Sequence, residues 1–101
     1  MATTSKALFR GAATTSVGTT LYTVPASTTT VVTSIVVTNT AATAATFDLA
    51  LNGTKLADTT AIAADTIVVI DLKQVISATQ TIAGGASAVT VNFHISGVEI
   101  A

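Results

Sequence analysis

The pattern of apolar and polar residues from Thr28 to Thr40, TTTVVTSIVVTNT, predicts a central β-strand. From Thr28 to Val37 every residue except Ser34 is β-branched, and such side chains favour a strand over a helix. Successive side chains of a strand point to opposite faces, so one face of this strand is apolar and the other mixes Val with Thr. The mixed face predicts partial cover by a loop, a terminal arm or a neighbouring subunit.

Two further segments, residues 47–51 and 88–95, alternate between apolar and polar positions. Asn52-Gly53 follows the first segment directly. Asn-Gly is the strongest short hairpin signal, because a type I′ turn needs a positive φ at both of its central residues. The apolar faces of these segments and of the central strand predict a core that contains Ile35, Val37, Phe47, Leu49, Leu51, Val91 and Phe93.

Shorter runs predict additional strands at residues 21–24, 54–57, 66–72 and 79–83. The run TIVVIDL at 66–72 is apolar on both faces, so we expect both of its faces to be covered. Between these strands we expect a loop at 58–65, a turn at 84–87 and a bulge at Ser96-Gly97. Seven or eight short strands, with turn signals roughly every 8–12 residues, predict an all-β chain. The expected fold is a single antiparallel β-sandwich over residues 12–101, either Ig-like or jelly-roll, with its strand order open.

The first residues, 1–11, are expected to form an N-terminal arm outside the sandwich. They are mostly polar but contain Leu8 and Phe9, with Lys6 and Arg10 on either side. Terminal segments are loose unless something holds them, and two apolar side chains give such an arm a means of docking. We therefore expect Lys6, Leu8, Phe9 and Arg10 to bind a partner.

Composition adds that much of the surface is expected to lie in contacts with other subunits. The chain has 101 residues, enough for one domain, and only 9% of them are charged, with a net charge of −1. Little charge repulsion would keep free copies apart, which predicts a homodimer or homotrimer. No apolar run approaches the ~18 residues of a membrane span, and the net charge gives no sign of nucleic-acid binding.

Candidate catalytic and metal-binding residues are scattered rather than grouped. His94 is the only histidine, there is no cysteine, and the acids form no DxD pattern; they are Asp48, Asp58, Asp65, Asp71 and Glu99. No GxSxG motif occurs, and Gly84-Gly85 lacks the lysine of a phosphate loop. We therefore expect no enzymatic activity, no metal and no cofactor. Tyr22 remains open as a platform for a sugar ring or as a ring packed at the sandwich edge.

Three blocks of the sequence resemble small β-sandwich virion proteins of tailed bacteriophages. They are LYTVPASTTTVVTSIVVTNT at 21–40, TIVVIDL at 66–72 and VTVNFHISGVEIA at 89–101. The resemblance covers most of the chain but leaves the N-terminal arm outside. The stretch from Lys73 to Gln80 is longer and more polar than in that group.

The resemblance implies a non-enzymatic structural protein of the virion. The leading expectation is a capsid cement or decoration protein, made in the host cytoplasm, that binds the assembled major capsid protein on the capsid surface. A tail, neck or baseplate component remains an alternative. A carbohydrate- or receptor-binding β-sandwich is a second alternative, and Tyr22 is the residue that would favour it.

Overall fold

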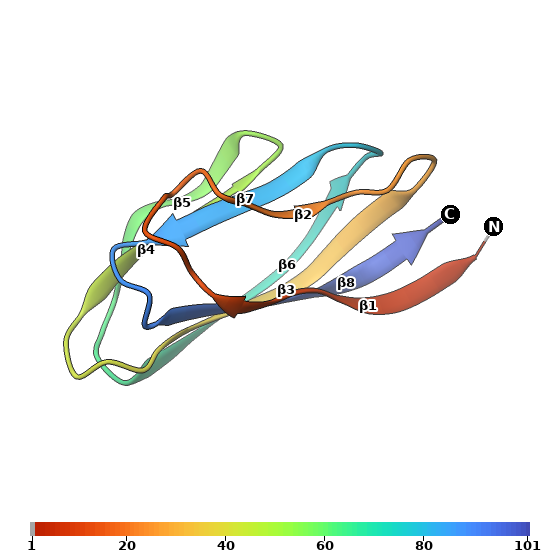
Figure 1. Cartoon of the computed structure of the whole chain (residues 1–101). Coiled ribbons are helices and arrows are strands. Elements are labelled where there is room, and N and C mark those ends of the chain that lie inside the picture. The colour runs from red at the N-terminus through yellow and green to blue at the C-terminus, as the bar shows by residue number, and fades with distance from the viewer. Residues whose placement is uncertain (1) are drawn as a thin grey trace.

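Eight antiparallel β-strands make up the computed structural model of the chain, which describes residues 2–101 (Figure 1). None of the described residues lies in a helix, so the prediction of an all-β sandwich is confirmed. The strands are β1 (Thr3–Ala12), β2 (Thr20–Thr23), β3 (Thr29–Asn39), β4 (Ala45–Leu51), β5 (Thr54–Ile62), β6 (Thr66–Ile76), β7 (Thr81–Ala86) and β8 (Val91–Ile100).

The strands pair in nested order and form two four-stranded sheets. β1 pairs with β8, β2 with β7, β3 with β6 and β4 with β5, as if one long hairpin had been folded over. Contacts of β8 with β3 and of β7 with β4 complete sheet A, in the order β1-β8-β3-β6, and sheet B, in the order β2-β7-β4-β5. This order is that of a jelly roll, which decides between the two sandwich types left open by the sequence.

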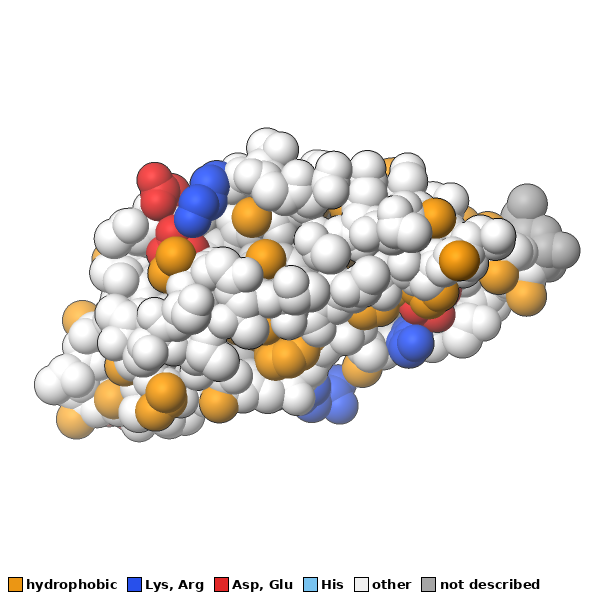
Figure 2. All heavy atoms as spheres, turned by 45° about the horizontal axis from the view of Figure 1, so that its top comes forward, with side chains coloured by type: hydrophobic (Ala, Val, Ile, Leu, Met, Phe, Trp, Pro, Cys, Tyr) orange, Lys and Arg blue, Asp and Glu red, His pale blue; other side chains and the backbone are white. Residues whose placement is uncertain are grey.

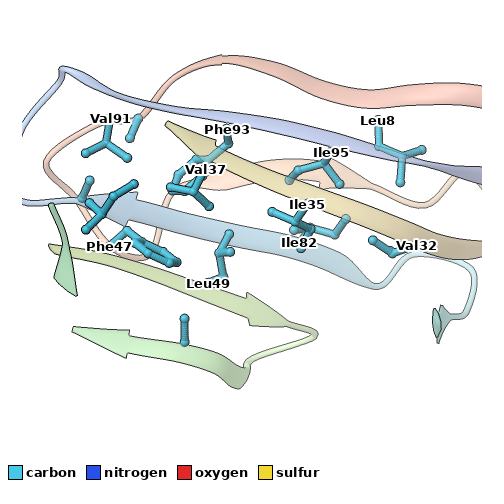
Figure 3. Packing of buried hydrophobic residues seen from close by; sticks show 14 of the residues in the cluster. Leu8, Val32, Ile35, Val37, Phe47, Leu49, Ile82, Val91, Phe93 and Ile95 are labelled. Atoms are coloured by element: carbon cyan, nitrogen blue, oxygen red, sulfur yellow. The ribbon is translucent and has the colours of Figure 1, made fainter. Parts of the chain in front are cut away.

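The core lies between the two sheets and is built from the predicted inward rows. Figure 3 shows Ile35, Val37 and Phe93 of sheet A facing Phe47, Leu49 and Ile82 of sheet B. The rings of Phe47 and Phe93 meet edge to face, with centroids 6.3 Å apart. Six of the seven predicted core residues are buried, and Leu51, at the end of β4, is partly buried.

The hairpin prediction at Asn52-Gly53 is confirmed by the backbone. Asn52 has φ of 49° and Gly53 has φ of 79°, the two positive values that a type I′ turn requires. β5 is longer than expected and runs through residues predicted to be a loop. It continues past Asp58 because its register to β4 shifts at this point and Thr59, at φ 47°, absorbs the extra residue.

The turn predicted at residues 84–87 is wrong. β7 runs straight through Gly84 and Gly85. A Cβ on Gly84 would lie 2.5 Å from the backbone oxygen of Asp48, and one on Gly85 would overlap the backbone of Ser16. These glycines let other backbone segments approach closely and do not turn the chain.

The bulge expected at Ser96-Gly97 lies instead on the two strands beside β8. β8 is regular from Val91 to Ile100, whereas β1 shifts register at Leu8 and β3 shifts at Thr33. Gly97 points inward, where a Cβ would overlap the carbonyl of Val31 and lie 2.9 Å from Leu8. The missing side chain thus lets both bulged neighbours close on β8.

The segment predicted as an arm is a strand of the sandwich. Residues 3–12 pair with β8 along their whole length, and Leu8 is only 7% exposed within the core. Ala2 and Ala101 exchange two backbone hydrogen bonds of 2.9 Å, so the described ends of the chain lie side by side (Figure 1). Met1, which belonged to the predicted arm, lies outside the described residues. The hydrogen-bonded ladder with β8 offsets the backbone entropy that is lost when this segment becomes ordered.

Phe93→Ala should lower the free energy of unfolding by about 3–5 kcal/mol, because Phe93 is fully buried against Phe47. Chemical denaturation followed by circular dichroism measures this loss. Val89→Ala is the control, since Val89 is 63% exposed, and should change stability by less than about 0.5 kcal/mol. A loss below ~1 kcal/mol for Phe93→Ala would contradict the register of β8.

Leu8→Ala tests whether β1 belongs to the sandwich. Leu8 fills a buried position, so its truncation should cost about 2–5 kcal/mol in the same unfolding measurement. Arg10→Ala, two residues along the strand at an exposed position, should cost little. Equal and negligible effects of the two changes would show that β1 is detached in solution.

Candidate functional site

The four residues expected to bind a partner lie along β1 and serve different purposes. Leu8 is buried in the core, and Phe9 packs against the core from a partly buried position. Lys6 forms an ion pair of 3.4 Å with Glu99, and Arg10 is exposed, opposite His94 of β8. The apolar pair is therefore used by the chain's own sandwich, and of the four only Arg10 is left facing outward.

A polar cluster joins the two sheets near the chain ends. The Tyr22 hydroxyl of sheet B donates a hydrogen bond to Glu99 of sheet A and lies 2.9 Å from the Thr30 hydroxyl. Burial of Tyr22 and then its bond to the Glu99 carboxylate raise the pKa of Tyr22, and the bond to Thr30 opposes them. Because Glu99 binds both the Tyr22 hydroxyl and Lys6, the cluster ties β2 to β8 and β8 to β1.

A second charged pair lies on the outer side of sheet B. The Lys55 ammonium donates a 2.7 Å hydrogen bond to the carboxylate of Asp48, whose side chain is nearly buried. This bond is the main reason why the pKa of Asp48 lies below its ordinary value, and it raises the pKa of Lys55. Asp58 lies close enough to contribute to both shifts. The pair links the two strands of the Asn52-Gly53 hairpin.

The other candidate residues for chemistry stay apart in space. His94 lies on the outer face of sheet A, opposite Val36 on one side and Arg10 on the other. Among residues 2–101, no three side chains of His, Cys, Asp or Glu come together in a way that could hold a metal ion. No described helix is long and apolar enough to cross a membrane.

The most prominent surface feature is a row of exposed apolar side chains on the outer face of β6. Ile67, Val69 and Val75 are 66%, 65% and 64% exposed, and we call them the β6 row. Val36 and Val31 of β3 lie directly opposite Val69 and Val75 and are half-buried. Apolar side chains thus extend from the edge of sheet A toward its centre, and nothing in the described chain covers them.

Charges are sparse over the rest of the surface. On the face that Figure 2 shows, blue and red side chains occupy a few small spots, and most of the area belongs to backbone and uncharged groups. β6 carries two exposed charges, Asp71 and Lys73. Since the whole chain has only four cations and five acids, long stretches of sheet surface have no charged group. A partner therefore meets mostly Thr, Ser, Ala and Val.

Two shallow hollows flank β6, and neither gathers reactive groups. One, of about 390 Å³, is lined by Thr38, Asn39, Thr40, Asp65, Thr66 and Ile67. The buried Asn39 amide is already bonded, donating to the carbonyls of Thr43 and Ala63 at 2.9 and 3.3 Å. The other, of about 350 Å³, lies between the Asn52-Gly53 hairpin and the end of β6. Most of the groups that line these hollows are hydroxyl, amide and apolar side chains.

The sequence analysis expects the partner-binding residues on β1, whereas the exposed apolar face lies on β6. TIVVIDL was recognised as apolar on both faces, which predicts that something covers the outer face. The structure provides cover only for the inner face, where Val68, Ile70 and Leu72 pack against the core. The uncovered apolar face is the feature that points to a partner.

Comparisons of the chain with protein-family models, with curated proteins and with solved structures gave no significant match.

The Asp48–Lys55 pair should make stability depend on acid pH. Because the pKa of Asp48 is depressed in the folded state, the unfolded state takes up a proton first as the pH falls. The stability due to the pair is complete above about pH 4, the unfolded pKa, and is lost as the pH falls through the folded pKa. Asp48→Asn should thus be less stable than the wild type at pH 7, and the difference should shrink toward about pH 3.

Urea denaturation of both proteins at several pH values between neutrality and about pH 3 would measure this difference. Asp65→Asn is a suitable control, since Asp65 is exposed and far from Lys55 along the chain. A difference between Asp48→Asn and wild type that stays constant over this whole range would contradict a stabilising charge on Asp48.

Proposed function

We propose that the protein is a non-enzymatic structural protein of a bacteriophage particle, which acts as a capsid cement or decoration protein. In this role it binds the assembled major capsid protein and stabilises the shell. The resemblance of residues 21–40, 66–72 and 89–101 to small virion proteins suggests the particle. The single observation that carries the binding role is the uncovered β6 row on the outer face of sheet A.

The β6 row has the properties of a docking surface. Exposed apolar side chains that lie together mark interaction sites more often than scattered ones do. Fully burying a Val or Ile side chain stabilises a complex by roughly 1.5–3 kcal/mol before ordering costs. A β-sheet face is already ordered, so little additional entropy is lost when a flat partner covers it. Asp71 and Lys73 lie on the same face between Val69 and Val75, so a partner that covers the whole row also has to pair or desolvate these two charges.

The polar clusters support a structural rather than a catalytic role. Glu99 binds Tyr22 and Lys6 across the sandwich, and Asp48 binds Lys55 across a hairpin. Each group is satisfied by a neighbour that fixes a strand, and His94 has no carboxylate at a directly opposing position. General acid–base catalysis needs a group free to reach a substrate proton.

A component of the tail, neck or baseplate would use the same surface, and it remains the first alternative. The carbohydrate-binding alternative loses its main support. A sugar platform needs an open aromatic face with a free polar rim, whereas Tyr22 is partly buried and its hydroxyl is bound to Glu99 and Thr30.

The test is sedimentation of the purified protein with phage heads assembled in its absence. Wild-type protein should sediment with the heads, and Ile67→Lys should bind at least about tenfold more weakly, because a charge would replace a buried apolar group. Val89→Lys is the matched control, because Val89 is equally exposed but lies in the turn between β7 and β8. Equal binding by both variants would remove the β6 row from the interface, and binding to tails but not heads would favour the alternative.

A further inference from the structure

The four edge strands of the sandwich differ in how they are protected. Exposed edges are templates for pairing with another chain, and proteins block them with short strands, bulges or inward-pointing charges. β2 has only four residues, and β5 has two register shifts against β4. On β1, Lys6 lies opposite the inward-pointing Gly97, and the register shifts at Leu8. Three edges thus carry a recognised protective feature.

The edge of β6 also carries one register shift, but β6 is the longest of the four edge strands. β6 has 11 residues, about twice the usual strand length, and it pairs only with β3. It points no charged side chain into the sandwich, since its two charges, Asp71 and Lys73, are exposed. Its register to β3 shifts between Asp71 and Gln74, so Leu72 and Lys73 lie between two regularly paired segments, residues 66–71 and 74–76.

The outward side chains on the two sides of Leu72 are complementary to each other. The outer face of β6 reads Val69, Asp71, Lys73, Val75 around Leu72. When two copies run antiparallel with Leu72 opposite Leu72, Asp71 faces Lys73 of the second copy and Val69 faces Val75 of the second copy. The twofold axis repeats each of these pairs, so opposite charges and apolar groups are matched on both sides of the axis.

Neighbouring registers lack this match. A shift of the axis to residue 71 places Asp71 against itself, and a shift to residue 73 places Lys73 against itself. If the axis passed between two residues, outward side chains of one copy would lie opposite inward side chains of the other, which a sheet does not allow. Opposite charges across an antiparallel pair stabilise it and like charges destabilise it, so the charges favour the register centred on Leu72 over its neighbours.

We propose that two copies of this chain pair through their β6 edges, about a twofold axis at Leu72, and join their A sheets into one continuous sheet. The interface is isologous, so both copies use the same residues. Backbone hydrogen bonds along the edge supply affinity, and the alternating side chains supply the register. The two copies of the β6 row then lie side by side on one face. The pairing does not depend on a phage particle.

The experiment uses reciprocal charge reversals in the full chain, measured by sedimentation equilibrium. Wild-type protein should show a species of twice the 10.0 kDa mass of the chain. Asp71→Lys places a lysine opposite Lys73, and Lys73→Asp places an aspartate opposite Asp71. Each variant alone should therefore self-associate on the order of tenfold more weakly, or worse. An equimolar mixture of the two should recover the dimer, since every charged pair across the interface is then opposite in sign.

Two controls make the result specific. Arg10→Glu changes the net charge by as much as Lys73→Asp but lies on the opposite edge strand of sheet A, so it should dimerise like the wild type. Raising the salt to ~0.5 M should narrow the difference between single variants and mixture, because exposed charges are then screened within a few ångströms. Circular dichroism melts check that each variant is folded.

Several outcomes would overturn the proposal. A wild-type protein that is still monomeric at ~0.5 mM would exclude the pairing, because a specific complex is expected to form well below that concentration. Single variants that dimerise as tightly as the wild type, or a mixture that stays monomeric, would exclude this register. A trimer that none of the reversals affects would place self-association on another surface. None of these outcomes bears on head binding by monomers, which the sedimentation test with heads measures separately.

Discussion

The pairing of β8 with both β1 and β3 is the contact on which the rest of the sandwich depends. It brings together the two ends of the chain and the central strand, so the inward rows of sheet A exist as one surface only when β8 is in place. Gly97 is the point of closest approach, with the backbone of Val31 on one side and Leu8 on the other. Pairing between distant parts of a sequence requires long loops to close before the stabilising contacts can form. This entropy cost predicts slow folding.

Local features were predictable from the sequence, and features that depend on a distant partner were not. Alternation in residues 47–51 and 88–95 identifies strands and inward faces because the period of a strand is local. Asn52-Gly53 identifies its turn because two positive φ values are a property of two residues. The roles of Gly84, Gly85 and Gly97 are not predictable locally, because these glycines admit the backbones of Asp48, Ser16 and Val31, which are remote in sequence.

The candidate site shows the same division. Leu8 and Phe9 are expected from the sequence to bind a partner, but in the structure they pack on the chain's own core. Conversely, the sequence of residues 66–72 predicts cover for a second apolar face, and the described chain does not provide it. The sequence states which side chains need burial, whereas the topology decides which of them the chain itself can bury.

An uncovered β6 row and an open β6 edge have different consequences for the proposed binding to a repetitive capsid surface. The β6 row alone gives each copy one apolar contact. Binding through this contact is weak, because association costs the copy its translational freedom. Pairing through the edge would place two rows on one rigid sheet face, and the second row then binds at a high effective concentration.

The twofold axis also imposes a condition on the partner. A rigid dimer engages both rows only where two equivalent sites are related by a matching local axis. A closed shell made of identical subunits contains many such axes, whereas a smooth or irregular partner offers none. The symmetry of the β6 edge and the proposed location on a capsid therefore favour each other, although each is measured by a separate experiment.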